Sequence, residues 1–301
     1  MRVLITGGSG FVGQRLCRRL KEAGHRLLVV SRDPERVRDR LPEGTEIRRS
    51  ALDFVDTPPQ AVVNLAGESI AARRWSEEQK ERLIDSRVNV TRDVVRLCEQ
   101  LQASDGHAPA VMVSASAMGY YGDQGDREVT EQTPPHDEFA HRLCKRWEEV
   151  AQEVEAFGTR LAILRLGLVL DVGGGSLQKM LPPFKLGLGG RFGSGKQFMP
   201  WVHREDVVRA ILFLIERDDL SGPFNGSAPH PVTNAEFTRT LARHLHRPAI
   251  FPVPAIVLET AFGEMSRLLL TGADMRPARL LEAGFTFRFP TLEEALADIL
   301  G

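Results

Sequence analysis

The sequence predicts an α/β fold, with a doubly wound parallel sheet of the Rossmann type and a smaller C-terminal lobe. Three observations support this prediction. Short apolar segments of strand length alternate with amphipathic segments of helix length along most of the chain. The first apolar segment ends in glycines that lead directly into a helical pattern. The alternation stops near Asp171, where a segment rich in glycine and proline begins.

The expected strands are short apolar runs, because a strand that is buried on both faces of a parallel sheet needs no polar side. They cover residues 3–5, 26–30, 46–47, 61–65, 110–113, 161–164 and 224–226, of which 46–47 is the weakest. The expected helices have apolar residues at helical spacing. They cover residues 12–23, 76–102, 139–156, 207–215, 234–245, 255–262 and 292–300.

This pattern predicts a division of the chain into two parts. We expect residues 1–170 to form the Rossmann domain, with 201–229 returning to it. Residues 171–200, expected to be rich in loops, and 230–301 are expected to form a smaller substrate-binding lobe over the carboxyl edge of the sheet. Ligands bind at that edge in open α/β sheets. We therefore expect the functional site between the sheet and the lobe.

Composition excludes several classes of protein. The 301 residues carry a net charge of −1 without a basic stripe, which argues against a nucleic-acid partner. We expect no membrane partner, because no apolar run approaches the roughly 20 residues that span a bilayer, and no signal peptide, because a strand-like run follows Met1 closely. Three cysteines without a CxxC pair favour a reducing compartment and no metal site. These features predict a cytoplasmic protein that acts on a small molecule, and they leave its oligomeric state open.

A glycine-rich loop predicts a dinucleotide site. Gly7, Gly10 and Gly13 lie between the first strand and the first helix, which begins near Phe11 and Val12. The first glycine allows a tight turn, the second lets the backbone approach a pyrophosphate, and the third lets helix and strand pack closely. The alternative is a turn that binds no ligand, since glycine occurs in many such turns. The position after the first strand and before a well-patterned helix favours the dinucleotide.

The end of the second strand predicts which dinucleotide binds. An acidic side chain at that place accepts a hydrogen bond from the ribose 2′-hydroxyl and selects NAD, whereas this chain has Ser31 and Arg32. A guanidinium and a hydroxyl suit a 2′-phosphate, so the sequence favours NADP(H). The alternative is that Arg32 is a solvated surface residue and Asp33 reads the ribose. Asp53, after the third strand, is either an adenine contact or an exposed loop acid.

At this point the residues show a resemblance to a known family. Thr6 to Gly13 resembles the TGxxGFxG signature of extended and atypical short-chain dehydrogenases/reductases, and Asn64 to Gly67 is similar to their NxAG motif. Further runs resemble the epimerase-like branch that is labelled nucleoside-diphosphate-sugar epimerase. These runs are Leu65-Ala66-Gly67-Glu68, Arg74-Trp75, Ser86-Arg87, Gly119-Tyr120-Tyr121-Gly122, Leu186-Gly187-Leu188-Gly189-Gly190 and Glu282-Ala283-Gly284-Phe285.

The resemblance covers essentially the whole chain, and it implies an NADP-binding Rossmann domain with a small C-terminal lobe. By position it implies cofactor contacts from Ser31, Arg32, Leu65, Ala66, Gly67, Arg87 and Leu168. Arg87 also makes chemical sense, because a cation on a helix that faces the loops can meet a phosphate. The alternative for Arg87 is an ordinary arginine on a helix surface.

The family's catalytic pair is not present in its usual form. Short-chain dehydrogenases use a tyrosine and a lysine four residues apart, so that both lie on one helix face. This chain contains no YxxxK, but His141 and Lys145 have that spacing in the expected helix 139–156. A histidine can transfer protons near neutral pH. If Trp147 and Glu148 set the alignment, Ala140 and Cys144 occupy the two positions instead, and surface roles for His141 and Lys145 are the alternative.

The end of the fifth strand offers two further candidates. Ser116 lies where the family's substrate-orienting hydroxyl is expected, although it can equally satisfy backbone groups at a strand end. Tyr121, or its neighbour Tyr120, can supply a phenol from the same loop. The sequence therefore leaves two functions open. One is an NADP(H)-dependent oxidoreductase or epimerase acting on a carbinol or keto group, for example of a compound like a nucleotide sugar. The other is a non-catalytic NADP(H)-binding regulator.

Overall fold

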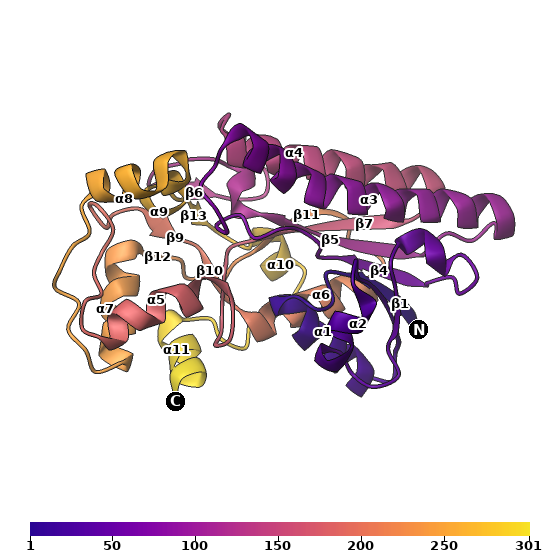
Figure 1. The fold of residues 1–301 in the computed structure, drawn as a ribbon, viewed down its shortest axis with the longest axis horizontal. Helices are drawn as coiled ribbons and strands as arrows, with labels where there is room; N and C mark the ends of the chain where they lie inside the picture. Colours follow the sequence, from indigo (N-terminus) through magenta and orange to yellow (C-terminus); the bar gives the residue numbers. More distant parts are fainter.

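The computed structural model describes residues 1–301 except for the side chain of Asp105. Its main element is a parallel sheet of seven strands in the order β11-β7-β5-β4-β1-β2-β3 (Figure 1). The strands are β1 (Arg2–Thr6), β2 (Arg26–Val30), β3 (Glu46–Arg48), β4 (Ala61–Asn64), β5 (Val111–Ala117), β7 (Arg160–Leu166) and β11 (Gly222–Gly226). The order in which successive strands are added to the sheet reverses between β1 and β4. Doubly wound folds bind their ligands at this switch point. The predicted doubly wound sheet is confirmed.

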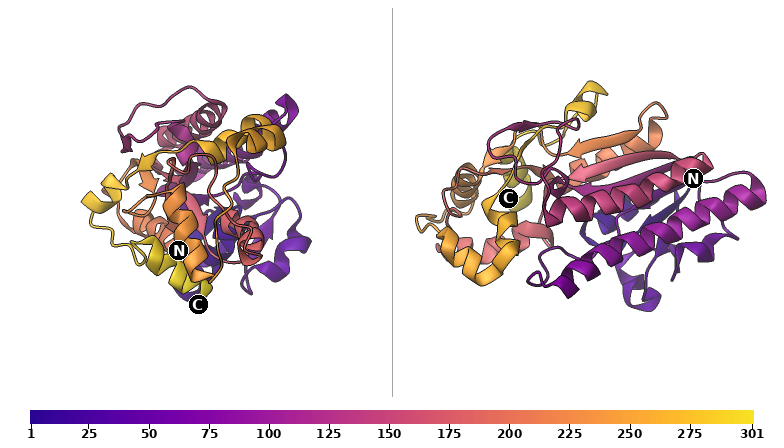
Figure 2. Two further views of the ribbon diagram at one scale, coloured as in Figure 1. Left: turned by 90° about the vertical axis from the view of Figure 1, so that its left-hand side faces the viewer. Right: turned by 90° about the horizontal axis from the view of Figure 1, so that it is seen from above.

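Helices cover both faces of this sheet. Helices α1 (Phe11–Glu22) and α6 (Arg204–Glu216) pack against each other on one face. Helices α3 (Glu77–Asp105) and α4 (Phe139–Gln152) run side by side over the other face (Figure 2). Alternate residues of β1 serve the two layers: Val3 and Ile5 pack with α1 and α6, whereas Leu4 packs with α3. This alternation follows from the period of two in a strand.

The C-terminal lobe lies at the carboxyl edge of the sheet, on the left in Figure 1. Its helices are α5 (Gly175–Lys185), α7 (Asn234–His244), α8 (Ala255–Phe262), α9 (Arg267–Leu270) and α11 (Leu292–Leu300), whereas α10 (Ala278–Glu282) packs against β11 and its Leu280 lies in the core of the sheet domain. Three short strand pairs lie outside the seven-stranded sheet: β8 (Leu168–Leu170) with β10 (Trp201–His203), β9 (Phe198–Met199) with β12 (Val232–Thr233), and β6 (Glu128–Val129) with β13 (Asp274–Met275). The short helix α2 (Pro34–Val37) follows β2.

One prediction about the lobe is wrong in part. Residues 171–200 were expected to be rich in loops, but Gly175–Lys185 forms α5 in spite of Pro182 and Pro183 within it. Each proline removes a backbone donor and disfavours a helix. Leu177 and Phe184 are buried in the hydrophobic cluster of the lobe, so tertiary packing outweighs local preference. The division of the chain at residues 170, 200 and 229 stays a prediction. Trp201, from the segment expected to return to the Rossmann domain, packs in the cluster of the lobe.

Two classes of feature are not found among the residues that the structure describes. None of their helices is both long and apolar enough to cross a membrane. Nor do the histidine, cysteine and acidic side chains of this described part form a group of three or more that suits a metal ion.

Candidate functional site

The glycine loop folds so tightly that two of its positions have no room for a side chain. Gly7 has a φ of +69°, and a Cβ there would lie 2.7 Å from the carbonyl oxygen of Leu65. A Cβ on Gly13 would lie 2.2 Å from the carbonyl oxygen of Gly7. The amide of Gly10 closes the turn by donating to that same oxygen at 2.9 Å. The loop therefore brings backbone into close contact with both α1 and the end of β4.

Helix α1 begins at this loop with its donors free of side-chain caps. Gly10 is the N-cap residue, and no side chain caps the helix or places an acid in its first turn. The first N–H groups of a helix and its dipole favour a negative charge at that end. This end of α1 is suited to a phosphate group.

A hydrogen-bond network fixes the loop after β4 beside the glycine loop. The Thr6 hydroxyl donates to Asn64 Oδ1 at 2.6 Å and accepts from the amides of Leu65 and Ala66, each at 3.1 Å. The Asn64 amide nitrogen donates in turn to the hydroxyls of Thr91 and Ser114. The side chains of Thr6 and Asn64 thus hold together β1, β4, β5 and α3 at the carboxyl edge.

The residues after β2 are arranged so that Arg32 is free and Asp33 is not. The Asp33 carboxylate accepts from the amide of Arg36 at 3.3 Å and caps α2. The Ser31 hydroxyl lies next to the backbone of Asp33, from whose amide it accepts at 3.3 Å. Arg32 is exposed, and none of the described residues binds its guanidinium. A 2′-phosphate is the kind of group that this arrangement suits, because the free side chain is the cation and the acid is already engaged.

The third strand also ends in a capped turn. Asp53 accepts from the amide of Ser50 at 3.0 Å and so takes part in a capping box at the short 3₁₀ helix Ala51–Phe54. This contact gives Asp53 a structural role. The prediction that Asp53 meets adenine stays a prediction.

Arg87 of α3 is a partly buried cation without an acidic partner. Its guanidinium donates to the carbonyl oxygens of Leu83 and Glu68, each at 2.8 Å, and lies over the ring of Trp147. Nε is buried and unpaired, and no salt bridge joins Arg87 to a carboxylate among the described side chains. Burial lowers the pKa of Arg87. A buried charge without a counter-charge is costly, which makes an anionic ligand the simplest complement to this side chain.

The lobe reaches over the glycine loop at Phe11. A Cβ on Gly174 would lie 2.3 Å from the Phe11 ring, so the start of α5 packs directly on it. The guanidinium carbon of Arg204 also lies over the Phe11 ring, 4.7 Å from its centroid. This guanidinium pairs with Asp171 at 2.6 Å. Leu168, another predicted cofactor contact, is partly buried at the start of β8, and its amide donates to the carbonyl oxygen of Pro200 at 2.7 Å.

At the other end of the site, the predicted catalytic residue Ser116 belongs to a buried ion-pair network. Its hydroxyl donates to Glu148 Oε1 at 2.6 Å. Arg165 of β7 donates to the same carboxylate through Nε at 3.0 Å and Nη2 at 2.9 Å. All three residues are buried. Burial opposes the charge of Arg165, but its hydrogen bonds to the Glu148 carboxylate raise its pKa.

Tyr121 is held by the same network. Its hydroxyl donates to Asn225 Oδ1 at 2.6 Å and accepts from Arg165 Nη1 at 3.0 Å. The side chain is fully buried at 0% exposure. Burial raises the pKa of Tyr121 to about 12, against the opposing effect of Arg165. These contacts favour a structural role for Tyr121, and its catalytic role stays a prediction.

The structure does not bring His141 and Lys145 to a common site. His141 is buried, and its Nδ1 forms a 2.6 Å hydrogen bond with the carbonyl oxygen of Tyr120, whereas Lys145 is exposed. The alternative alignment places Ala140 against Gly119, where an added Cβ would lie 3.0 Å from that of Ala140. It places Cys144 in the interior, where burial raises the pKa of the thiol to about 11. The pairing of His141 with Lys145 stays a prediction that this geometry does not favour.

Sequence reasoning missed Glu148, Arg165 and Asn225 as members of one network. One signal was available: Arg165 interrupts an otherwise apolar strand, and a charged residue inside a buried strand needs a buried partner. The identity of that partner was not readable, because Glu148 lies on α4 and Asn225 lies on β11.

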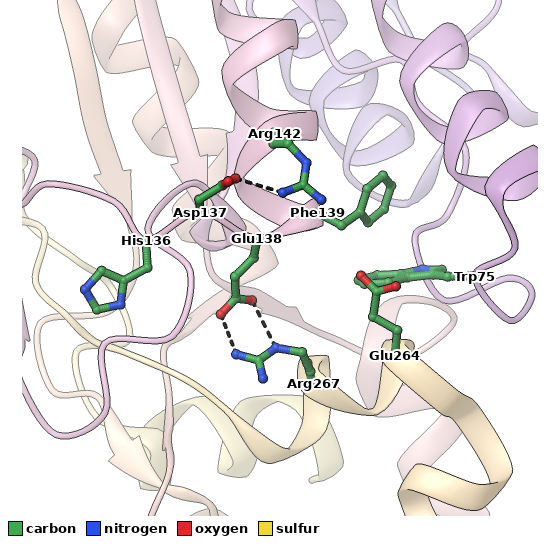
Figure 3. Close-up of a pocket in the computed structure, with 8 residues that line it drawn as sticks. All are labelled: Trp75, His136, Asp137, Glu138, Phe139, Arg142, Glu264 and Arg267. Atoms are coloured by element: carbon green, nitrogen blue, oxygen red, sulfur yellow. Dashed lines mark hydrogen bonds and ion pairs between the residues drawn. The ribbon is translucent and has the colours of Figure 1, made fainter.

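A cavity of about 410 Å³ opens between the N-terminal ends of α3 and α4 and the lobe (Figure 3). It is lined by Trp75, His136, Asp137, Glu138, Phe139, Arg142, Glu264 and Arg267. Ion pairs hold its rim together: Arg142 with Asp137 at 2.8 Å, Arg267 with Glu138 at 2.5 Å and, just outside, Lys80 with Glu264 at 2.7 Å. None of the predicted cofactor contacts lines it. Its aromatic and charged walls suit a small polar molecule.

Comparison with known proteins supports this description. The model of the NAD dependent epimerase/dehydratase family matches residues 3–225, and a domain of unknown function, DUF1731, matches residues 253–299. The chain is 41% identical over 299 residues to the epimerase family protein Mb2239 of Mycobacterium bovis, covering 98% of this chain and 96% of that protein. It is 35% identical to the epimerase family protein YfhF of Bacillus subtilis, covering 100% and 98%.

Solved structures are similar over the whole chain. The human epimerase family protein SDR39U1 with NADPH aligns with a TM-score of 0.87 at 34% identity, covering 100% of this chain and 99% of that one. UDP-glucose 4-epimerase of Thermus thermophilus, in complex with NAD, aligns with a TM-score of 0.77 at 19% identity, covering 100% and 98%. The second likeness shows the fold alone.

Proposed function

We propose that this chain, which belongs to the NAD dependent epimerase/dehydratase family, binds NADP(H) and uses it in an oxidoreductase or epimerase reaction on a carbinol or keto group. One observation carries the choice of cofactor. Arg32 is free and exposed at the end of β2, while Asp33, the acid that would favour NAD, caps α2. The human relative SDR39U1 was solved with NADPH, which supports the same choice.

The residues fit this cofactor along the whole carboxyl edge. The end of α1, with Gly7, Gly10, Phe11, Val12 and Gly13, would hold the pyrophosphate. Ser31 and Arg32 would hold the 2′-phosphate. The loop Leu65–Gly67, with Arg87 and Leu168, would border the remainder of the nucleotide. The unpaired Nε of Arg87 supports this assignment, since it lies beside that loop. When bound, the nicotinamide supplies or accepts a hydride.

The substrate is proposed to be a small polar molecule that enters through the cavity at Trp75 and Phe139. Its aromatic and charged lining supports this class, which includes compounds like nucleotide sugars. A cytoplasmic location is part of the proposal, because Cys17, Cys98 and Cys144 are all free and buried, as expected in a reducing compartment.

One specific arrangement favours a second function, a non-catalytic NADP(H)-binding regulator. Ser116 and Tyr121 are buried in an ion-pair network and His141 is buried as well, so three of the four predicted catalytic side chains do not lie open to a ligand. The two functions make different predictions with NADPH bound. The enzyme oxidises NADPH when a panel of nucleotide sugars and small carbonyls is added, and the regulator leaves the absorbance of NADPH unchanged with every compound.

The cofactor proposal is tested by calorimetry with NADPH and NADH. Arg32→Asp should weaken NADPH binding about 10- to 100-fold, because a charge-assisted contact to the 2′-phosphate is lost, and should leave NADH binding nearly unchanged. Arg18→Asp, at an exposed position on α1, is the matched control and should change neither. Equal losses for the two nucleotides would contradict the 2′-phosphate assignment. A wild-type chain that binds neither nucleotide would overturn the proposal as a whole.

A further inference from the structure

We propose that Tyr120 is the phenol that exchanges a proton with the substrate oxygen beside the nicotinamide. The inference rests on the proposed function, since it assumes a carbinol or keto substrate and bound NADP(H). It differs from the expectation for Tyr121 and for a proton donor on α4. The starting observation is that these neighbouring tyrosines have opposite environments: Tyr121 is fully buried, whereas Tyr120 is partly exposed.

Tyr120 lies at the carboxyl edge of the sheet. It ends the 3₁₀ helix Met118–Tyr120, which follows β5 directly. Strand β5 pairs with β4, whose following loop, Leu65–Gly67, borders the proposed cofactor site. Tyr120 is therefore placed on the β5 side of the switch point, away from the adenosine end at β2.

Three neighbours fix the ring of Tyr120. The Arg165 guanidinium carbon lies 3.4 Å from the ring centroid, and the rings of His141 and Tyr121 make edge contacts at 5.2 and 5.4 Å. Arg165 is itself fixed, because its donors bind Glu148 and Tyr121. The hydroxyl of Tyr120, in contrast, has no hydrogen-bond partner among the described residues and is not one of the buried unpaired groups. The network thus immobilises the ring and leaves its hydroxyl for a ligand.

The other groups at this end of the site are occupied or inaccessible. Ser116 already donates to a buried carboxylate, and Tyr121 already donates to Asn225. The thiol of Cys144 is buried. His141 uses its Nδ1 on the backbone of Tyr120, and Lys145 faces solvent. Among the acid–base side chains considered, Tyr120 alone combines a fixed position with a free proton.

The surroundings of Tyr120 connect it with the proposed substrate cavity. Gly119 packs against Ala140, so the loop fills the space over the first turn of α4. Tyr120 packs on the hydrophobic cluster that contains Phe139 and Trp75, and these two side chains also form one wall of the cavity in Figure 3. Tyr120 and the cavity therefore share the hydrophobic cluster around Phe139.

The proton balance of the step is simple. In the reducing direction the O–H bond of Tyr120 breaks, and its proton bonds to the carbonyl oxygen of the substrate. Bound NADPH would supply the hydride, which carries both the hydrogen and the two electrons of the new C–H bond, and the phenolate regains a proton from water. Arg165 lies where it stabilises the transient negative charge on the ring, although Glu148 offsets part of its field.

Nitration by tetranitromethane tests the inference, because the chain contains only two tyrosines. Mass spectrometry should find nitration of Tyr120 and not of Tyr121. NADPH at about 100 times its Kd leaves roughly 1% of the protein free, so a phenol at the nicotinamide should be nitrated more than about tenfold more slowly. Adenosine 2′,5′-bisphosphate, which lacks the nicotinamide half, is the matched control and should not protect Tyr120.

Each other outcome has a defined meaning. Nitration of Tyr120 that is unchanged by bound NADPH, or slowed equally by the bisphosphate, overturns the inference and leaves the cofactor proposal intact. Nitration of Tyr121 before Tyr120 also overturns it. Absence of NADPH binding in calorimetry overturns the proposed function, and this inference with it. Tyr120→Phe should retain wild-type NADPH affinity and thermal stability, since its hydroxyl has no partner among the described residues.

Discussion

The two ends of the carboxyl edge differ in the groups that they present: mainly backbone at one end and buried charged side chains at the other. The end at β1 and β2 relies mainly on backbone: a glycine loop and an uncapped helix start. The end at β5 and β7 is made of buried side-chain charge, with Arg165 and Glu148 at its centre. Backbone N–H groups do not titrate, so they bind in the same way at any pH at which the protein is folded. A buried ion pair, in contrast, fixes the side chains around it only while both of its partners are present.

This difference separates holding a ligand from acting on it. At the backbone end the pyrophosphate needs only shape and dipole, because it is recognised by N–H groups that are already in place. The charged end fixes Tyr120 and Tyr121 relative to each other through Arg165. We interpret the first as the binding half and the second as the half that sets the chemistry.

The largest expected effect comes from breaking the buried pair. Glu148→Gln leaves Arg165 buried without a counter-charge, and this should lower the free energy of unfolding by about 3–5 kcal/mol. Glu149→Gln, one position along α4, is the matched control. The carboxylate of Glu149 is exposed and lies 4.0 Å from Arg146, so Glu149→Gln should lower the free energy of unfolding by less than about 0.5 kcal/mol. Urea denaturation measures both.

A double variant sharpens this prediction. Glu148→Met with Arg165→Met removes both charges, so it should be less destabilised than Glu148→Gln alone. If Glu148→Gln unfolds at the same urea concentration as wild type, the pair is not what holds this end of the site.

Much of the backbone end could be predicted from the sequence. The glycine loop, the strands beside it and the choice of Ser31 and Arg32 are local patterns, in which neighbours in sequence are neighbours in space. The confirmed sheet rests on the same kind of information. Helix α5 was missed because Pro182 and Pro183 are local signals against a helix, while the burial of Leu177 and Phe184 depends on distant elements.

The charged end was less predictable for the same reason. The spacing of His141 and Lys145 is correct for one helix face, but the spacing does not say how deeply α4 sits on its neighbours. In the structure the boundary between buried and exposed residues passes between these two side chains. The choice between Tyr120 and Tyr121 likewise depends on Asn225, which is 104 positions from Tyr121. No local pattern contains that contact.

The second largest effect is expected at the backbone end. Gly7→Ala would place a Cβ 2.7 Å from the Leu65 carbonyl oxygen at a φ of +69°, so the loop must move and NADPH affinity should fall by more than about 100-fold. Gly24→Ala separates the two causes. Gly24 has a φ of +80° but no atom within 4 Å of an added Cβ.

Gly24→Ala should therefore cost only about 1 kcal/mol of stability and leave NADPH affinity unchanged. Calorimetry and thermal unfolding of the two variants decide between the causes. Similar NADPH affinities for Gly7→Ala and wild type would mean that the loop is a turn and not a binding element.

The smallest effect is expected at the rim, where Glu138 joins the sheet domain to Arg267 of the lobe at 2.5 Å. Burial opposes the charge of Glu138, but the hydrogen bond from Arg267 prevails and lowers its pKa. The stability from this pair is therefore complete above the unfolded pKa of about 4.3 and is lost as pH falls through the lower folded value.

Arg267 is half exposed, so Glu138→Gln should cost less than about 1 kcal/mol at pH 7. This difference from wild type should shrink as the pH falls below about 4. Glu43→Gln, at an exposed position without an ion pair among the described residues, is the control and should cost little stability. A difference that persists unchanged in acid would show that Glu138 holds the lobe through packing rather than charge.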